Sequence, residues 1–197
     1  MLIFRIQYAP RTYSHNGDGI RRFLCQKYWR NRRWLIVKIW SLVNDAYFAC
    51  DSFEVWPEQT VAHSEPQFNT GGAKTTSDSF LELLRNYGQF TERVGLIKGS
   101  YKNSLTKNLA TKFVKENVKA SLIAVYCNLY ESYKSVFAWV DSFMQRGTVL
   151  YLDDLDTFRA QPDQGPKLAF KEYKEQTKWK FELFLPVASC SYSFIAC

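Results

Sequence analysis

The sequence predicts an α/β protein with a mostly parallel sheet that ends in an antiparallel hairpin. Four short apolar segments are separated by segments with helical spacing, and strands that alternate with helices form parallel sheets. Two more apolar segments close the chain around Pro186 with no helix between them, as in a hairpin. Acids or a glycine follow several strands, where such sheets bind ligands. The expected strands are 46–50, 94–98, 121–127, 148–152, 178–185 and 191–196.

The chain divides into two regions. Its 197 residues, 46% of them hydrophobic, suffice for a domain with a packed core. Residues 44–197 carry the alternating pattern and form this domain. Residues 1–43 match the pattern poorly, and we expect a helical region or a degenerate first strand–helix unit. Within them, 20–43 fits one helix, two helices, or a helix followed by a strand at 34–40.

Basic and aromatic side chains are interleaved over residues 21–34, and they contribute to a net charge of +7. Such a mixture can follow a phosphate backbone and stack bases, so nucleic-acid binding is one hypothesis. A solvated helix face with long basic side chains explains the same pattern. We favour this second interpretation, and nucleic acid is not an expected partner.

Other features exclude several classes of protein. The five cysteines show no CxxC spacing, and their odd number is typical of reduced thiols in the cytosol. The two histidines, His15 and His63, lie too far apart in the sequence to support a zinc site. No segment approaches the ~20 apolar residues of a membrane span, and the N-terminus lacks a signal-peptide pattern. We therefore expect a cytoplasmic protein without a membrane partner.

The first half of the domain begins with the strand 46–50, which ends at Asp51. In dinucleotide-binding folds an acid at this point accepts hydrogen bonds from ribose hydroxyls, although an aspartate after a strand also commonly begins a turn. Residues 56–79 are predicted to be a long loop, and Ser77 and Asp78 can cap a helix at 79–86. The strand 94–98 stops at Gly99, where a backbone can approach a ligand closely.

The second half contains helices at 105–117, 133–144 and 167–176 around two strands. The strand 148–152 stops at three acids, Asp153, Asp154 and Asp156. Acids at the end of a buried strand can hold a hard cation or orient a substrate hydroxyl. The same aspartates could instead begin a loop or cap a helix.

Several segments follow one another along the chain in a recognisable order: 50–54 with Trp56 and Pro57, Phe68 with Gly71, 93–99, 128–132, and 147–149 with Asp153 and Asp154. Together they resemble the macrocin O-methyltransferase family, from about Asn44 to the C-terminus. The members of this family are class I S-adenosylmethionine-dependent enzymes that act on sugar hydroxyls. The resemblance implies a Rossmann-like class I methyltransferase sheet. It also implies magnesium-assisted O-methylation of a sugar or similar small molecule, and a homodimer.

The resemblance also implies roles for individual residues. Asp51 would hold the ribose hydroxyls of the cofactor, and Asp153 and Asp154 would bind magnesium. A magnesium ion bound by the acceptor's hydroxyls would orient the reacting oxygen and lower its pKa. The remaining cofactor-binding residues would be Ser52, Phe53, Gly99, Ser100 and Tyr101.

Two departures from the family motifs concern the site itself. Tyr126 occupies the place of an acid that the family uses as metal ligand and candidate base. Asn128, which follows, can bind a metal through its carbonyl oxygen but cannot act as a base. The family's glycine-rich cofactor loop should lie near 23–34, yet no glycine occurs between Ile20 and Val43. The alternative hypothesis is therefore a catalytically silent methyltransferase-like domain that binds a partner or nucleic acid through residues 21–34.

Overall fold

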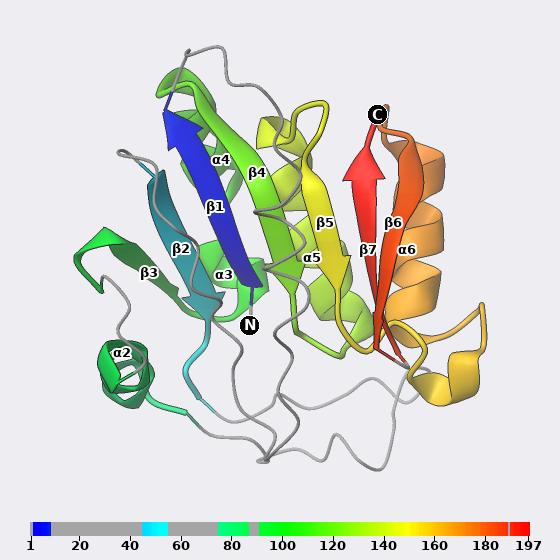
Figure 1. Ribbon diagram of the computed structural model, residues 1–197, viewed down its shortest axis with the longest axis horizontal. Coiled ribbons are helices and arrows are strands. Elements are labelled where there is room, and N and C mark those ends of the chain that lie inside the picture. The colour runs from blue at the N-terminus through cyan, green and yellow to red at the C-terminus, as the bar shows by residue number, and fades with distance from the viewer. Residues whose placement is uncertain (1, 9–44, 55–74, 87–90, 189) are drawn as a thin grey trace.

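The computed structural model describes residues 2–8, 45–54, 75–86, 91–188 and 190–197, which form one mixed sheet with helices packed on it (Figure 1). The seven strands lie in the order β3-β2-β1-β4-β5-β7-β6. The strands are β1 (Leu2–Tyr8), β2 (Asp45–Asp51), β3 (Val94–Lys98), β4 (Val118–Val125), β5 (Val149–Leu152), β6 (Phe181–Ala188) and β7 (Ser191–Ala196). The helices are α2 (Ser77–Asn86), α3 (Tyr101–Ser104), α4 (Lys107–Lys115), α5 (Tyr130–Val140) and α6 (Gly165–Gln176).

The pairing of the strands confirms the predicted fold class. β2 is parallel to β3 and β4 is parallel to β5, whereas β7 runs antiparallel to both β5 and β6. The last two strands therefore form the expected antiparallel hairpin. Because β1 is antiparallel to both β2 and β4, the strands β2 to β6 all run in one direction.

The central strand β1 was not predicted. Residues Phe4–Tyr8 alternate between apolar and polar, which is typical of a strand, but this alternation covers only five residues. Leu2 is paired with Cys50 on one side and Val125 on the other, so the amino end of β1 meets the carboxyl ends of its neighbours. The carboxyl end of β1 consequently lies at the opposite edge of the sheet.

The main core lies between the sheet and helices α3 to α6, which cover the same face (Figure 1). Helix α5 buries Tyr133, Val136, Phe137 and Val140, as the helical spacing predicts. The ring of Phe137 stacks on that of Tyr173 from α6, with centroids 4.5 Å apart. This packing fixes α5 beneath the ends of β4 and β5.

The opposite face carries smaller apolar clusters. Ala49 and Cys50 are consecutive in β2 and therefore point to opposite faces. Cys50 belongs to the main core, whereas Ala49 packs with Phe53 and with Phe80 and Leu84 of helix α2. A further cluster joins Ala124 and Tyr151 with Phe184 and Leu185.

Several element boundaries differ from the predicted ones for identifiable reasons. The helix expected at 105–117 is shorter, at Lys107–Lys115, and it begins after Thr106 because the Thr106 side chain caps it by accepting a hydrogen bond from the Leu109 N–H. Thr76, rather than Ser77, accepts the capping bond of α2, from the Ser79 N–H. β6 continues through Pro186, since an edge strand tolerates a residue without an N–H.

Some predictions lie outside the described residues. These are the basic aromatic region 21–34, both histidines, and most of the loop expected at 56–79. The boundary near residue 43 stays a prediction. Among the described helices, none combines the length and the apolar character that crossing a membrane requires.

Candidate functional site

The strands β2, β3, β4 and β5 end at the same side of the sheet, which we call the carboxyl edge. Asp51 pairs with Lys98 at the ends of β2 and β3, and Val125 pairs with Leu152 at the ends of β4 and β5. β2 and β5 are three strand positions apart, which corresponds to about 14 Å at the usual strand spacing. We call Asp51 and the residues that follow β2 and β3 the Asp51 half, and the residues that follow β4 and β5 the Asp153 half. Open α/β sheets bind ligands along this kind of edge.

The Asp51 half is a turn joined to the loop that follows β3. Oδ1 of Asp51 accepts a hydrogen bond from the Phe53 N–H at 2.8 Å, and Phe53 takes a φ of 57°. The Gly99 N–H donates to the Asp51 carbonyl oxygen at 3.0 Å. Gly99 has a φ of 129°, a conformation that favours glycine. The fold thus brings together two residues that the sequence separates by nearly fifty positions.

Ser52 and Ser100 lie in these same two segments. The Ser52 Oγ accepts a hydrogen bond from the Glu54 N–H at 3.2 Å. The Ser104 hydroxyl donates to the carbonyl oxygens of Ser100 and Gly99 at 3.0 and 3.1 Å. Ser104 was not predicted as part of the site, although it closes the loop that contains Gly99.

Tyr101 anchors this loop to the core. Its hydroxyl donates to the Cys50 carbonyl oxygen at 3.2 Å, and its ring packs against the main core. Burial raises the pKa of Tyr101 well above its ordinary value, so the phenol stays neutral. The position of this hydroxyl indicates a structural role beside Asp51.

The Asp153 half is built around hydrogen bonds to Asp153. Its N–H donates to the Val125 carbonyl oxygen at 2.9 Å, and its own carbonyl oxygen accepts the Tyr133 hydroxyl at 2.5 Å. Oδ1 of its carboxylate accepts the Tyr151 hydroxyl at 2.9 Å and also the Ser191 hydroxyl. None of these three hydroxyls was predicted as part of the site. The period of two in β5 could have indicated Tyr151, which faces the same side as Asp153.

Asp154 and Asn128 face each other. The Asn128 amide nitrogen donates to Oδ2 of Asp154. Both residues have left-handed backbones, with φ of 54° for Asn128 and 52° for Asp154, which asparagine and aspartate adopt more readily than most residues. The Asp154 carbonyl oxygen accepts the Thr157 hydroxyl at 2.7 Å, which fixes the turn after β5.

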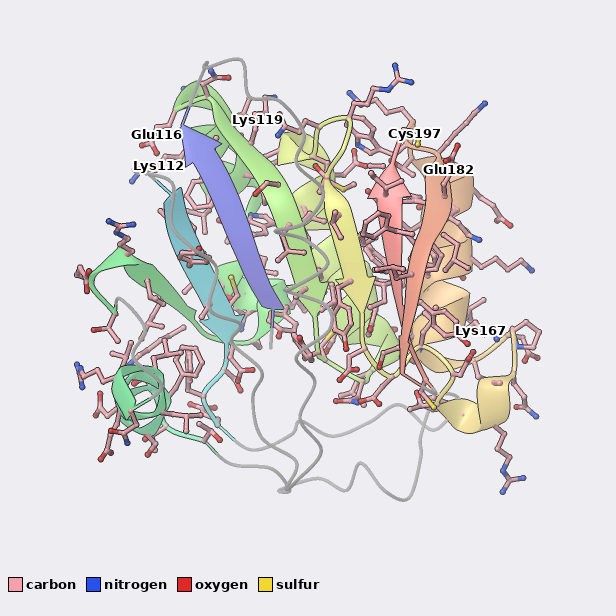
Figure 2. The ribbon with its side chains drawn as sticks, viewed as in Figure 1. Lys112, Glu116, Lys119, Lys167, Glu182 and Cys197 are labelled. Atoms are coloured by element: carbon pink, nitrogen blue, oxygen red, sulfur yellow. The ribbon has the colours of Figure 1, made fainter. Side chains whose placement is uncertain are left out.

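Asp156 binds side chains of α6 and β7 rather than those of Asp153 or Asp154. Its carboxylate forms an ion pair with Lys167 of α6, with 2.7 Å between Oδ1 and Nζ, and it also accepts the Tyr192 hydroxyl. Figure 2 shows Lys167 near the carboxyl edge, on the same side of the sheet as the strand ends, whereas Cys197 marks the opposite edge. Burial of the Asp156 carboxyl raises its pKa, but the bonds from Lys167 and Tyr192 outweigh this and lower it overall. These contacts explain Asp156 as a structural residue.

Tyr126, in the Asp153 half, contacts apolar clusters next to both halves. It packs against the cluster around Ala49 and Phe53, and also against the cluster around Tyr151. Its ring centroid is 5.3 Å from that of Tyr151. Burial and the nearby Asp153 charge raise the pKa of Tyr126 more than its hydrogen bond with Tyr151 lowers it. Its phenol therefore remains protonated in the physiological range.

The residues of the Asp153 half do not fit a magnesium ion. In the part of the chain that the structure describes, no three or more His, Cys, Asp or Glu side chains are grouped to hold a metal. Magnesium binds oxygen ligands, but Asn128 directs its amide nitrogen toward Asp154. Oδ1 of Asp153 already accepts two hydroxyl groups. The Asp153 half therefore lacks the set of oxygen ligands that magnesium prefers.

Comparisons with known proteins support the fold. Neither a family model nor a curated protein matches the chain. Among solved structures, it resembles the O-methyltransferase NovP with a TM-score of 0.55 and 17% identity, over 75% of this chain and 58% of that one. It resembles the calicheamicin methyltransferase CalS11 with the same TM-score and identity, over 75% of this chain and 59% of the other.

The chain spans about three fifths of the length of these two neighbours. At this level of identity the likeness concerns the fold alone. The resemblance found in the sequence and the likeness of the structure agree on a methyltransferase-like α/β fold, and the narrower macrocin-type assignment stays a prediction.

Proposed function

We propose that the chain is an S-adenosylmethionine-dependent O-methyltransferase domain that acts on a hydroxyl of a sugar or similar small molecule. The observation that carries this proposal is the placement of Asp51 and Gly99 side by side at the carboxyl edge. Asp51 supplies a carboxylate for ribose hydroxyls, and the Gly99 loop lets the ligand approach the backbone closely. The acids of the Asp153 half lie on the same edge.

The chemistry requires a precise alignment rather than a strong catalyst. The acceptor oxygen forms a bond to the methyl carbon as the carbon–sulfur bond breaks, and its proton leaves to a carboxylate. Holding the two reactants in line supplies a large part of such a rate enhancement. Asp153 and Asp154 are carboxylates at this edge that can orient the hydroxyl and accept the proton, whereas Asn128 cannot be the base and the Tyr126 phenol is protonated.

The magnesium ion implied by the resemblance would supply orientation of the acceptor oxygen and a lower pKa for it. The residues of the Asp153 half do not favour a magnesium ion, because Asn128 directs its amide nitrogen toward Asp154 and Oδ1 of Asp153 already accepts two hydroxyl groups. A sugar as acceptor, a homodimer and a cytoplasmic location also stay predictions.

A methyltransferase-like domain without transfer activity is the second candidate. The specific observation in its favour is the direction of β1. In doubly wound sheets the first strand ends at the ligand crevice, and the loop after it receives the cofactor. Here the amino end of β1 lies at that edge instead, because Leu2 is paired with Cys50 and Val125.

Titration calorimetry of the full chain with S-adenosylhomocysteine, the product form of the cofactor, separates the two candidates. The methyltransferase proposal expects saturable binding at micromolar to low millimolar concentration, together with a raised midpoint of thermal unfolding. A flat titration at millimolar ligand, with an unchanged midpoint, would reject it in favour of the silent domain. An oligonucleotide titration at two salt concentrations then tests the nucleic-acid form, since phosphate contacts weaken with salt.

A further inference from the structure

The carboxylate of Asp153 is held within a chain of hydroxyl groups. Tyr151 and Ser191 donate to the same oxygen of Asp153, and Tyr126 hydrogen-bonds with Tyr151 in turn. Two donors fill the two lone pairs that one carboxylate oxygen presents. A metal ion that used this oxygen would have to displace a hydroxyl that is already in place.

The partner of Asp154 is also a hydrogen-bond donor. Asn128 offers its amide nitrogen to Asp154, and the left-handed backbones of both residues set the direction of the two side chains. A cation is repelled by the positive end of an N–H bond. The Asn128–Asp154 pair is thus complete as a hydrogen bond and unsuited as a pair of cation ligands.

Tyr126 is the third residue of the Asp153 half that does not suit a divalent cation. It lies where the family resemblance expects a metal-binding carboxylate, and its ring packs with both apolar clusters on its side of the sheet. A neutral phenol is a poor ligand for magnesium, which prefers carboxylates, carbonyls and water. The same phenol can donate or accept a hydrogen bond.

We infer that the Asp153 half is a metal-independent site for a hydroxylated ligand, in which the Tyr126–Tyr151–Asp153 chain takes over the positioning that a divalent cation would provide. The identity of the ligand rests on the proposed function, because this ligand is the acceptor of the proposed methyl transfer. The expectation that no divalent cation binds does not depend on the proposed function. Tyr126 is accordingly a positioning residue for the acceptor.

Manganese is the probe for the cation, because it has ligand preferences close to those of magnesium and its free form is counted directly by electron paramagnetic resonance. We expect the native chain to bind less than one manganese ion per chain at 1 mM metal, on the order expected from scattered surface carboxylates. Saturable binding of one ion at or below about 0.1 mM, lost in Asp153→Asn, would overturn the inference.

Two substitutions of Tyr126 test whether a carboxylate at this position would create a manganese site. Tyr126→Asp adds a third carboxylate beside Asp153, and we expect it to gain one manganese site with an affinity at least tenfold above that of the native chain. Tyr126→Phe keeps the ring without the hydroxyl and should gain none. If Tyr126→Asp does not fold, Asn128→Asp adds a carboxylate beside Asp154 and serves the same purpose. Failure of both folded variants to gain the site would contradict the assignment of this position.

The acceptor role has a separate readout. If S-adenosylhomocysteine binds but manganese does not, methyl transfer to a panel of sugars should be unaffected by a chelator, and Tyr126→Phe should raise KM for the acceptor more than it lowers kcat. Transfer abolished by the chelator would refute metal independence. If S-adenosylhomocysteine does not bind at all, the proposed function and the acceptor role fail, whereas the manganese result still decides whether this edge binds a cation.

Discussion

The two halves of the carboxyl edge are built differently. Asp51 accepts hydrogen bonds from two backbone groups: the Phe53 N–H donates to its carboxylate and the Gly99 N–H to its carbonyl oxygen. Asp153 accepts hydrogen bonds from three side chains, those of Tyr133, Tyr151 and Ser191. An aspartate whose donors are backbone groups tolerates changes of the side chains nearby, whereas one whose donors are hydroxyls depends on each of them. This difference predicts that substitutions in the two halves have different consequences.

The largest effect is expected for cofactor binding. Asp51→Asn keeps an oxygen that can accept the Phe53 N–H, but it removes the charge that would hold ribose hydroxyls. Hydrogen bonds to charged groups contribute about 1.5–3 kcal/mol, so the Kd for S-adenosylhomocysteine should rise about a hundredfold. Calorimetry measures this directly.

The control for this substitution lies in the other half. Asp154→Asn makes the same chemical change at the end of β5, and the Kd should stay within about threefold of the native value if the halves bind different molecules. An equal loss of affinity at both positions would show that the division of the edge is wrong.

A matched pair of tyrosine substitutions compares the stability of the halves. Tyr133→Phe removes a buried hydroxyl that donates to the Asp153 carbonyl oxygen at 2.5 Å, and the free energy of unfolding should fall by about 2 kcal/mol. Tyr101→Phe removes a hydroxyl that donates to the Cys50 carbonyl oxygen at 3.2 Å, and should cost about 1 kcal/mol because this bond is longer. Urea unfolding measures both free energies. A larger loss of unfolding free energy in Tyr101→Phe than in Tyr133→Phe would contradict this prediction.

Backbone conformation provides a further test of the Asp51 half. Gly99→Ala places a side chain at a φ of 129° and a Cβ 3.3 Å from the Cβ of Ser104, so unfolding should become easier by about 1.5 kcal/mol. Gly147, in the turn before β5, also has a positive φ, of 87°, but a Cβ added there meets no atom within 4 Å, so Gly147→Ala adds no close contact. It should therefore cost less, about 1 kcal/mol. Equal losses in urea unfolding would mean that the contact with Ser104 contributes nothing.

The sequence predicts the strands of the domain better than it predicts their partners. The strands 94–98 and 191–196 have their predicted bounds, Asp153 follows β5 as expected, and Asp51 is the last residue of β2. These features depend on local composition and spacing. The direction of β1 was not predictable, because a short apolar strand can pair in either orientation and the choice depends on its distant neighbours.

The hydroxyl contacts of the site show the same limit. Helix 133–144 was predicted with Val136, Phe137 and Val140 inward, and these residues are buried. The Tyr133 hydroxyl also points inward, but its partner is a carbonyl group twenty residues away, brought near only by the packing of α5 under β5. Ser191 reaches Asp153 only because β7 returns beside β5. Spacing along the chain therefore indicates which side chains are buried, and the assembled sheet decides which groups they meet.

The smallest expected effect concerns two buried cysteines, one beside each half. Cys50 precedes Asp51 and Cys127 precedes Asn128, and burial raises the pKa of both thiols, that of Cys127 from 9.0 to about 12. The folded state therefore keeps a proton that the unfolded chain begins to lose near pH 9. The stability that this provides is complete below pH 9 and is lost as the pH rises toward 12.

For Cys127 the loss amounts to about 0.8 kcal/mol at pH 9.5, which urea unfolding at pH 7.5 and 9.5 can measure as the change between the two pH values. In Cys127→Ala this change should be smaller than in the native chain by that amount, whatever the stability of the variant at pH 7.5. Cys50→Ala is the matched variant in the Asp51 half and should reduce the change in the same direction. An unaltered pH dependence in either variant would mean that its thiol becomes accessible to water before the chain unfolds. That half of the carboxyl edge would then open first.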